Sequence, residues 1–331
     1  MKTEISLESH RIQAKILHAA INLSDGKVSF SELEKMTGYD MTVIKENTKE
    51  LMESGVGYAG RKYFRIPELP DLILPPVVLT GLKSRFMGRR IFAYKSICST
   101  NDTARRLAES DSPEGTLIIA EKQTRGRGRM GRSWHSPQNK GLYFSLILRP
   151  RVTVEKMPAL SLVAALSVCR AIETMTDMRP QIKWPNDCLI DGKKAAGILI
   201  DISAELGRVS HAILGMGLNI NTAKKDFLSE LRKTATSLVI QTGKVFSRVD
   251  CLRTLLHEFE KSYRNFCRYG FEFMAPEIIK RSSVIGKEIS FKLSGKKYTA
   301  IALGYDENGG LRVKSKNGVK VLTGGEVTIR K

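Results

Sequence analysis

The sequence of 331 residues lacks Cys-x-x-Cys spacings, long apolar runs and any recognisable Ser-His-Asp or Cys-His arrangement for nucleophilic catalysis. Its five cysteines are scattered and odd in number, which predicts reduced thiols and argues against a zinc site or a disulfide framework. Residues 1–11 carry charges of both signs without the apolar core of a signal peptide. The most apolar helical stretch, 159–169, is too short to span a bilayer. These absences predict a cytoplasmic protein with no membrane partner.

Acidic residues are also scarce: 34 Asp and Glu stand against 54 Lys and Arg, for a formal net charge of +20. This charge predicts attraction to polyanions such as DNA, RNA or nucleotides. On charge alone, one interpretation is a general RNA-binding protein with steeply salt-dependent binding and no ATP turnover. The length and the apolar content of 42% allow two or three folded domains.

Residues 1–66 are predicted to form a winged helix-turn-helix domain. Apolar residues at helical spacing predict a helix that includes residues 12–21. Ser31 is expected to cap a short helix over 32–36, and a second helix of the motif is predicted over 41–53. A strand–turn–strand over 57–66 would be the wing. The alternative is an ordinary three-helix interaction module.

DNA contacts are expected from polar and cationic side chains of the second helix and the wing. These residues are Thr42, Lys45, Asn47, Lys49, Arg61, Lys62 and Arg65. Glu46 and Glu50 make the helix less basic than most DNA-reading surfaces.

A proline-rich linker is predicted over 67–76, followed by a large central domain over 77–275 and a C-terminal domain over 276–331. In the central domain, strands outnumber helices and cluster as hairpins, which predicts an α+β fold with a mixed sheet. Strands are expected at 91–94, 116–121, 142–148, 181–184, 188–190, 194–201 and 208–220, and long helices at 158–177 and 249–268. The last segment contains short strands separated by glycine turns, which predicts a small SH3-like β-barrel.

The run from Gln123 to Trp134 alternates glycine with arginine directly after a strand-like segment. Glycine lets the backbone approach a ligand closely, and arginines crowded on such a loop repel one another unless an anion is present. The run therefore predicts a loop that orders around a phosphate or carboxylate. An RGG-like nucleic-acid tail is a weaker interpretation, because the run lies between two strands and does not repeat.

Three further motifs accompany this loop. The segment Lys183–Asp187 is followed by a hairpin turn at Asp191-Gly192. That turn is expected to bring Lys183 and the strand of Lys194 side by side as a positive pocket, with small residues leaving room for a flat ligand. The run from Gly215 to Asn219 predicts a glycine-containing strand end, while Ser99-Thr100-Asn101, taken alone, predicts a helix cap.

In this order, Ser-Thr-Asn, Gln-x-x-Gly-Arg-Gly-Arg-x-Gly-Arg-x-Trp, Lys-Trp-Pro-Asn-Asp, Lys-x-Ala-Gly-Ile-Leu, Gly-x-Gly-x-Asn and Gly-Gly-Glu-Val-Thr-Ile-Arg resemble the biotin–protein ligases over essentially the whole chain. The predicted winged helix is similar to that of the bifunctional bacterial type, which also represses the biotin operon. The resemblance implies a catalytic fold like that of class II synthetases and biotin–lipoate ligases. It also implies ATP and biotin as substrates, with Mg²⁺. Its partners would be the biotin carboxyl carrier domain of acetyl-CoA carboxylase or a similar carboxylase, operator DNA, and a second copy in an adenylate-bound homodimer.

The resemblance also implies residue roles. Arg129 and Lys194 would be catalytic, at the junction of carboxylate and phosphate. The biotin-binding residues would be Ser99, Thr100, Asn101, Gln123, Arg127, Gly128, Arg129, Lys194 and Gly197. The ATP and adenylate residues would be Gly126, Gly131, Arg132, Trp134, Lys183, Asn186, Asn219 and Arg330. Asp187 would help to place Mg²⁺, and Glu326 belongs to the C-terminal motif.

One residue departs from the family pattern, and two other functions are alternatives to a biotin–protein ligase. Met130 occupies a loop position where arginine is frequent, and it is expected to change how tightly the adenylate is retained. A lipoate–protein ligase shares the chemistry, but the loop and Lys-Trp-Pro-Asn-Asp argue against it. A ligand-sensing transcription factor without catalysis would have no need of both Arg129 and Lys194.

Overall fold

The computed structural model describes residues 7–205, 207–293, 296–316 and 318–329. The chain packs into two compact units: residues 1–83 together with 247–253, and residues 84–246 together with 254–331. The four-segment division expected from the sequence is finer than these two units and stays a prediction.

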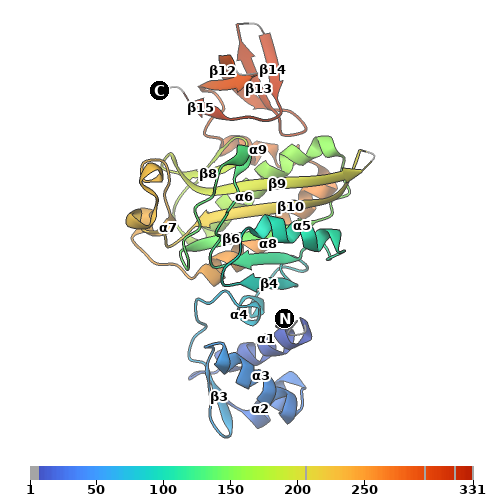
Figure 1. The fold of residues 1–331 in the computed structure, drawn as a ribbon, viewed down its shortest axis with the longest axis vertical. Coiled ribbons are helices and arrows are strands. Elements are labelled where there is room, and N and C mark those ends of the chain that lie inside the picture. Colours follow the sequence, from blue (N-terminus) through green and yellow to red (C-terminus); the bar gives the residue numbers. More distant parts are fainter. Residues whose placement is uncertain (1–6, 206, 294–295, 317, 330–331) are drawn as a thin grey trace. The chain divides into compact units, whose positions relative to one another are not determined.

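The first unit combines helices (Figure 1) with a small antiparallel sheet of order β1-β3-β2. Its elements are α1 (Leu7–Ile21), β1 (Lys27–Ser29), α2 (Phe30–Thr37), α3 (Met41–Glu53), β2 (Tyr58–Ala59), β3 (Tyr63–Arg65) and α4 (Pro75–Leu79). Fully buried Ile16, Leu17, Leu33 and Ile44 form part of its core. Helices α1, α2 and α3 and the β2–β3 hairpin therefore lie where they were expected, whereas α4 was not predicted and begins within the expected linker.

The expected cap of α2 is wrong by two residues. Ser29, not Ser31, is the N-cap: its hydroxyl accepts a hydrogen bond from Glu32 N, and the Glu32 carboxylate accepts one from Ser29 N. This reciprocal capping box satisfies two backbone donors at the helix start, an advantage that Ser31 lacks.

Residues 247–253 join the first unit through Asp71. The Asp71 carboxylate accepts hydrogen bonds from the backbone N–H groups of Arg248 and Val249, at 2.7 and 3.1 Å, and from Arg248 Nε at 2.9 Å. Arg253 donates to the carbonyl oxygen atoms of Val77 and Val78. The start of helix α8 (Arg248–Tyr269) is thereby capped by a residue far earlier in the chain.

The second unit is built on a mixed sheet of order β4-β5-β6-β10-β9-β8-β7 (Figure 1). Its strands are β4 (Ile91–Tyr94), β5 (Leu117–Ala120), β6 (Gly141–Leu148), β7 (Gln181–Lys183), β8 (Asp187–Ile190), β9 (Lys193–Glu205) and β10 (Arg208–Asn219). Strands β4 and β5 pair in parallel and the other pairs are antiparallel. The mixed sheet predicted from the sequence is confirmed.

The helices of this unit are α5 (Thr100–Glu109), α6 (Met157–Met175), α7 (Leu238–Thr242), most of α8, and α9 (Ala275–Lys280). Ala104 and Ala108 of α5 pack on Ile118, Ile147 and Ile213 of the sheet. Helix α6 lies in the core, and 72% of the apolar segment that by length and composition could cross a membrane is buried in the protein. Its apolar character is therefore explained by core packing.

The C-terminal part of the second unit is an antiparallel sheet of order β14-β13-β12-β11-β15. Its strands are β11 (Glu288–Leu293), β12 (Lys296–Tyr305), β13 (Leu311–Ser315), β14 (Gly318–Leu322) and β15 (Val327–Ile329). The short strands expected in the segment 276–331 are confirmed, although α9 occupies its first residues, and the turns expected at 294–295 and at Asn317 lie outside the described residues. Trp184, directly after β7 and 2% exposed, donates from Nε1 at 3.0 Å to the carbonyl oxygen of Gly309, in the connection between β12 and β13.

Candidate active site

A cavity of about 470 Å³ opens on one face of the mixed sheet. It is lined by the start of α5, by the Gly/Arg loop, by β8, β9 and β10, by residues 231–235 and by Glu326. All these parts belong to the second unit. The Gly/Arg loop and the lysine motifs, far apart in sequence, therefore meet in one place.

The sheet register leaves a flat floor for this cavity. Gly217 of β10 pairs with Gly197 of β9, so two residues without side chains lie next to each other on the same face. A Cβ on Gly217 would lie 2.3 Å from Cε2 of Trp134, and one on Gly197 would lie 2.8 Å from its Cζ3. The paired glycines therefore admit the Trp134 indole against the sheet. The Trp134 Nε1 atom is buried and meets no acceptor among the described residues.

A β-bulge turns Lys194 toward the same face. Cys188 pairs with Ala196, but the next residue, Leu189, pairs with Lys194, so one residue of β9 is skipped. Lys194 Nζ lies 2.6 Å from Asp187 Oδ1 and 5.3 Å from the centre of the Trp134 ring. The expectation that Lys183 and the Lys194 strand are direct neighbours is wrong, because β8 lies between β7 and β9. Both lysines nevertheless line the cavity.

The start of α5 supplies a buried polar cluster. Gln123 Oε1 accepts hydrogen bonds from the backbone N–H of Thr100 at 2.9 Å and from its hydroxyl at 3.1 Å. Asn101 Oδ1 accepts one from Ser145 Oγ at 2.6 Å. Ser99 stands at the N-cap position, but its side chain makes no capping bond, and its buried Oγ has no partner among the described residues. The interpretation of this motif as a plain helix cap is therefore wrong for Ser99, which is a residue of the cavity lining.

The Gly/Arg loop folds back on itself. Gly128 N donates to Arg132 O at 2.7 Å, and Trp134 N donates to Gly126 O at 2.8 Å. Met130 forms the tip with φ 55° and ψ 40°, in the left-handed region, and it is 72% exposed. The loop is a short closed turn whose cations are brought to the cavity rim.

Three arginines of this loop, Arg127, Arg129 and Arg132, line the cavity. Arg129 Nη1 donates to Asn186 Oδ1 at 3.3 Å, and burial lowers the pKa of its guanidinium while Asp187 and Glu326 oppose that shift. Arg132 forms an ion pair with Glu326. A partly buried cation at Arg129 beside an exposed one at Arg132 suits a ligand that carries or develops negative charge.

Most predicted site residues meet in this cavity. Those that line it are Ser99, Thr100, Asn101, Gln123, Arg127, Gly128, Arg129, Arg132, Trp134, Lys183, Asn186, Asp187, Lys194, Gly197 and Asn219. Gly126 and Gly131 do not line it and instead shape the loop backbone. Arg330 lies outside the described residues.

Several lining residues were not expected from the sequence, most of them from the segment before α7. They include Phe144 of β6, Leu189 of β8, and Phe227, Leu231, Lys233, Thr234 and Ala235. Thr234 O accepts a hydrogen bond from Lys194 N at 2.8 Å, and Thr236 N donates to Lys194 O at 2.9 Å. This irregular segment has no periodic pattern, so only the tertiary pairing reveals it.

The predicted DNA-contacting residues are exposed with one exception. Thr42, Lys45, Lys49, Arg61, Lys62 and Arg65 are on the surface of the first unit. Asn47 is only 7% exposed: its Nδ2 donates to Val43 O, and its Oδ1 accepts from Ser9 Oγ at 2.8 Å. Asn47 is therefore a core residue, and its assignment as a DNA contact is corrected.

Among the residues that the structure describes, no cluster of three His, Cys, Asp or Glu side chains could hold a metal by itself. Two carboxylates, Asp187 and Glu326, line the cavity, and each is ion-paired with a cation. This donor set fits Mg²⁺ bound mainly through phosphate oxygens, since that ion keeps few protein ligands in nucleotide sites.

Comparisons with known proteins agree with this geometry. The model of the biotin/lipoate A/B protein ligase family matches residues 93–219, and that of the biotin protein ligase C-terminal domain matches residues 284–330. A bifunctional ligase/repressor BirA from Bacillus spizizenii is 36% identical over 304 residues, which cover 91% of this chain and 94% of the relative. A biotin–[acetyl-CoA-carboxylase] ligase from Mycobacterium tuberculosis is 30% identical over 78% of this chain and 97% of its own.

A solved structure of a biotin protein ligase is also similar to this chain. The biotin protein ligase from Aquifex aeolicus, in complex with biotin and ATP, aligns with a TM-score of 0.63 and 32% identity. The alignment covers 73% of this chain and 99% of that one.

Proposed function

The chain belongs to the biotin protein ligase family, and from that premise we propose that it activates biotin with ATP and transfers it to a lysine of a carboxylase carrier domain. The observation that carries this proposal is the cavity itself. Its lining combines neutral polar side chains, among them Ser99, Asn101 and Gln123, with the cationic side chains of arginines and lysines. Such a site suits a neutral, hydrogen-bonding head group joined to a reacting carboxylate.

In the first step, an oxygen of the biotin carboxylate attacks the α-phosphorus of ATP, and pyrophosphate leaves. Negative charge accumulates around that phosphorus, so fixed cations lower the barrier more than a protein nucleophile would. Arg129 and Lys194 are proposed for this junction, with Lys194 held in place by Asp187 at 2.6 Å. Lys183 and Arg132 are proposed for the outer phosphates. Release of Arg132 would require its ion pair with Glu326 to open.

In the second step, the amine of the acceptor lysine attacks the acyl carbon of the adenylate. AMP leaves and the nitrogen loses a proton, forming an amide. Ser99, Thr100, Asn101 and Gln123 are proposed to hold the ureido head, and Trp134 to cover the adenylate. Mg²⁺, placed by Asp187 and Asn186, would supply charge neutralisation to the phosphates when bound.

The test is biotin-dependent exchange of labelled pyrophosphate into ATP, with lipoate in a parallel reaction. Exchange with biotin alone is expected. Exchange with lipoate alone would move the chain to the lipoate branch of the family. Absence of exchange with both would leave the sensor without catalysis as the better proposal. Lys194→Gln, which removes the cation, is the matched inactive control.

We also propose that the first unit is a winged helix-turn-helix that binds operator DNA as part of a biotin-responsive repressor. The exposed cations Lys45, Lys49, Arg61, Lys62 and Arg65 support it, since phosphate contacts by such side chains dominate DNA affinity. Relatives that carry the repressor name support the same role. We further propose that the adenylate-bound protein forms a homodimer, that its C-terminal sheet is an SH3-like barrel, and that the protein is cytoplasmic.

Repression is tested by titrating DNA from the region upstream of biotin synthesis or uptake genes with the protein plus biotin and ATP. Tighter binding with both ligands than without them is expected, together with a shift from monomer to dimer in sedimentation. Equal affinity in both states would leave a ligase without the regulatory role.

A further inference from the structure

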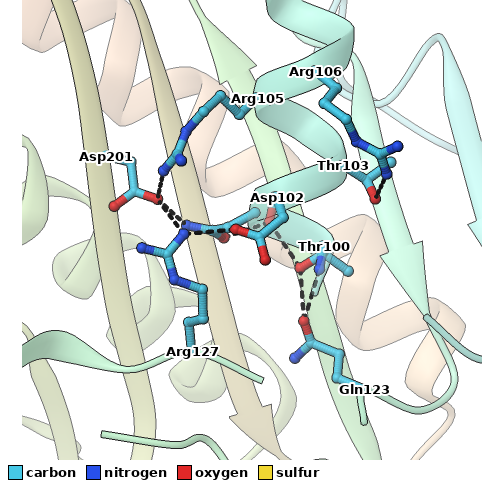
Figure 2. Close-up of polar contacts among 10 residues, drawn as sticks. Thr100, Asp102, Thr103, Arg105, Arg106, Gln123, Arg127 and Asp201 are labelled. Carbon is cyan, nitrogen blue, oxygen red and sulfur yellow. Dashed lines mark hydrogen bonds and ion pairs between the residues drawn. The ribbon is translucent and has the colours of Figure 1, made fainter. Parts of the chain in front are cut away.

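Asp201 of β9 contacts helix α5 and the Gly/Arg loop at once, although it belongs to none of the motifs identified in the sequence. Its Oδ2 atom accepts hydrogen bonds from Asn101 Nδ2 at 3.3 Å, Arg105 Nη2 at 3.0 Å and Arg127 Nη1 at 3.3 Å. Figure 2 shows this carboxylate with Arg105 of α5 on one side and Arg127 of the Gly/Arg loop on the other. A single oxygen atom of β9 thus contacts both helix α5 and the Gly/Arg loop.

The sheet register places Asp201 on the cavity face. Asp201 pairs with Ile213, and Gly197 pairs with Gly217. Because alternate residues of a strand share a face, Asp201 lies on the same face as Gly197, four residues along β9. The side chain is 20% exposed, whereas Arg127 is 40% exposed. The carboxylate therefore lies deeper than the loop residue that it holds.

The orientation of Asn101 depends on this carboxylate. Ser145 Oγ donates to Asn101 Oδ1, and Asn101 Nδ2 donates to Asp201, so both ends of the amide are engaged. On the far side of the network, Arg127 Nη1 also contacts Asp102 Oδ1 at 2.7 Å. The two arginines and two aspartates balance in charge. Removal of the Asp201 charge leaves Arg105 and Arg127 close together with one exposed carboxylate to offset them.

We propose that Asp201 is a positioning residue for biotin binding, which fixes the Asn101 amide and fastens the Gly/Arg loop over the cavity through Arg127. The inference deepens the proposed function, on which it rests. Asp201 does not line the cavity, so it acts through Asn101 and Arg127, both of which do. Its contribution lies on the biotin side of the site, away from the phosphate cations Lys183 and Arg132.

The test measures the KM of biotin, the KM of ATP and kcat in pyrophosphate exchange for Asp201→Asn. A partly buried, charge-assisted hydrogen bond contributes about 1.5–3 kcal/mol, so the biotin KM is expected to rise about 10- to 100-fold. The ATP KM and kcat are expected to change less than about threefold. Asp201→Glu, which keeps the charge, should recover a large part of the biotin affinity. An unchanged biotin KM, or an equal rise in both KM values with a fall in kcat, would overturn the proposal.

Coupling between the two residues is tested by Arg127→Gln alone and combined with Asp201→Asn. The double variant should bind biotin about as weakly as the worse single variant, because both substitutions remove the same contact between Arg127 and Asp201. Fully additive losses would contradict the proposal. Asp111→Asn is the charge-matched control: that side chain is fully exposed, its ion pair with Arg149 is 4.0 Å long, and it is outside the cavity.

A readout without catalysis separates this inference from the proposed function. Trypsin cleavage within residues 125–132, measured without ligand, should be several-fold faster in Asp201→Asn than in the wild type, while Asp111→Asn should match the wild type. Equal cleavage rates would overturn the loop-fastening role. If the wild type shows no biotin-dependent exchange, the proposed function fails, while the cleavage rates still decide whether Asp201 fastens the loop.

Discussion

Trp134 packs directly on Gly217, so closely that a single added methyl group would lie 2.3 Å from Cε2 of the indole. The neighbouring strand is equally close, because a methyl group added to Gly197 would lie 2.8 Å from Cζ3 of the same ring. The indole position is thus set by two backbones that lack side chains.

Gly217→Ala is therefore expected to displace Trp134 and to weaken biotin binding about 10- to 100-fold, since overpacking costs about 1–3 kcal/mol. Biotin titration followed by tryptophan fluorescence measures this. Gly304→Ala in β12 is the matched control, because no atom lies within 4 Å of its added Cβ. Biotin affinity in Gly217→Ala equal to that of the control would show that the indole does not shape the site.

Arg129→Gly should loosen the reactive intermediate. Arg129 is partly buried and donates a hydrogen bond to Asn186. The substitution removes its positive charge from the proposed carboxylate–phosphate junction, so release of the adenylate is expected to accelerate about 10- to 100-fold. The released adenylate would then acylate nearby lysines at random. Streptavidin blots of a mixed protein sample measure this, and labelling that stays confined to the carrier domain would disprove the role given to Arg129.

Asn47 and Lys45 lie two residues apart on α3 and should respond in opposite ways. Asn47→Ala removes hydrogen bonds with Val43 and Ser9 and is expected to cost about 1–2 kcal/mol of stability. Lys45→Ala should leave stability unchanged, weaken DNA binding and reduce its salt dependence by about one phosphate contact. Thermal melting and DNA titration at several salt concentrations distinguish the two; a stable Asn47→Ala variant with weakened DNA binding would restore the surface role.

Glu277 of α9 should make stability depend on acid pH. Arg170 of α6 donates hydrogen bonds to its carboxylate, and this contact lowers the pKa of Glu277 below its ordinary value of 4.5. The stabilisation is therefore fully present above about pH 4.5 and is lost as the pH falls through the folded-state pKa. Glu277→Gln is expected to cost about 1 kcal/mol at pH 7, discounted for partial exposure, and much less at pH 3. Urea unfolding at both pH values measures it; a constant difference would contradict this account.

The positions of β5 and β6 were predictable because each is a short, fully buried apolar run. The end of β9 was not, since the strand continues to Glu205 through polar and exposed residues beyond the expected 194–201. The Asp191-Gly192 hairpin was predictable as well: both residues have positive φ, at 48° and 73°, as its turn type requires. The burial of Asn47 was also within reach, since it follows Ile44 by three residues and precedes Leu51 by four on the buried face of α3. Likewise, Glu32 three residues after Ser29 is the spacing of a capping box.

Other features of the site depend on tertiary structure. The bulge that turns Lys194 toward Asp187 skips one residue, and nothing in the local sequence marks it. Arg127 meets Asp102 and Asp201 across separations of 25 and 74 residues, so neither partner follows from spacing. Loop residues 231–235 have no repeating pattern, and their place beside Lys194 is set by backbone pairing alone.

The capping of α8 by Asp71 has a consequence for synthesis on the ribosome. The first compact unit needs residues 247–253, which are made about 170 residues after its main segment ends at Lys83. At about 5–20 residues per second, the nascent unit waits roughly ten to thirty seconds for its last piece. During that interval, Asp71 and the carbonyl groups of Val77 and Val78 lack the arginines that bind them in the finished protein. Completion of the first unit is thereby delayed until all strands of the mixed sheet, which end at Asn219, have been synthesised.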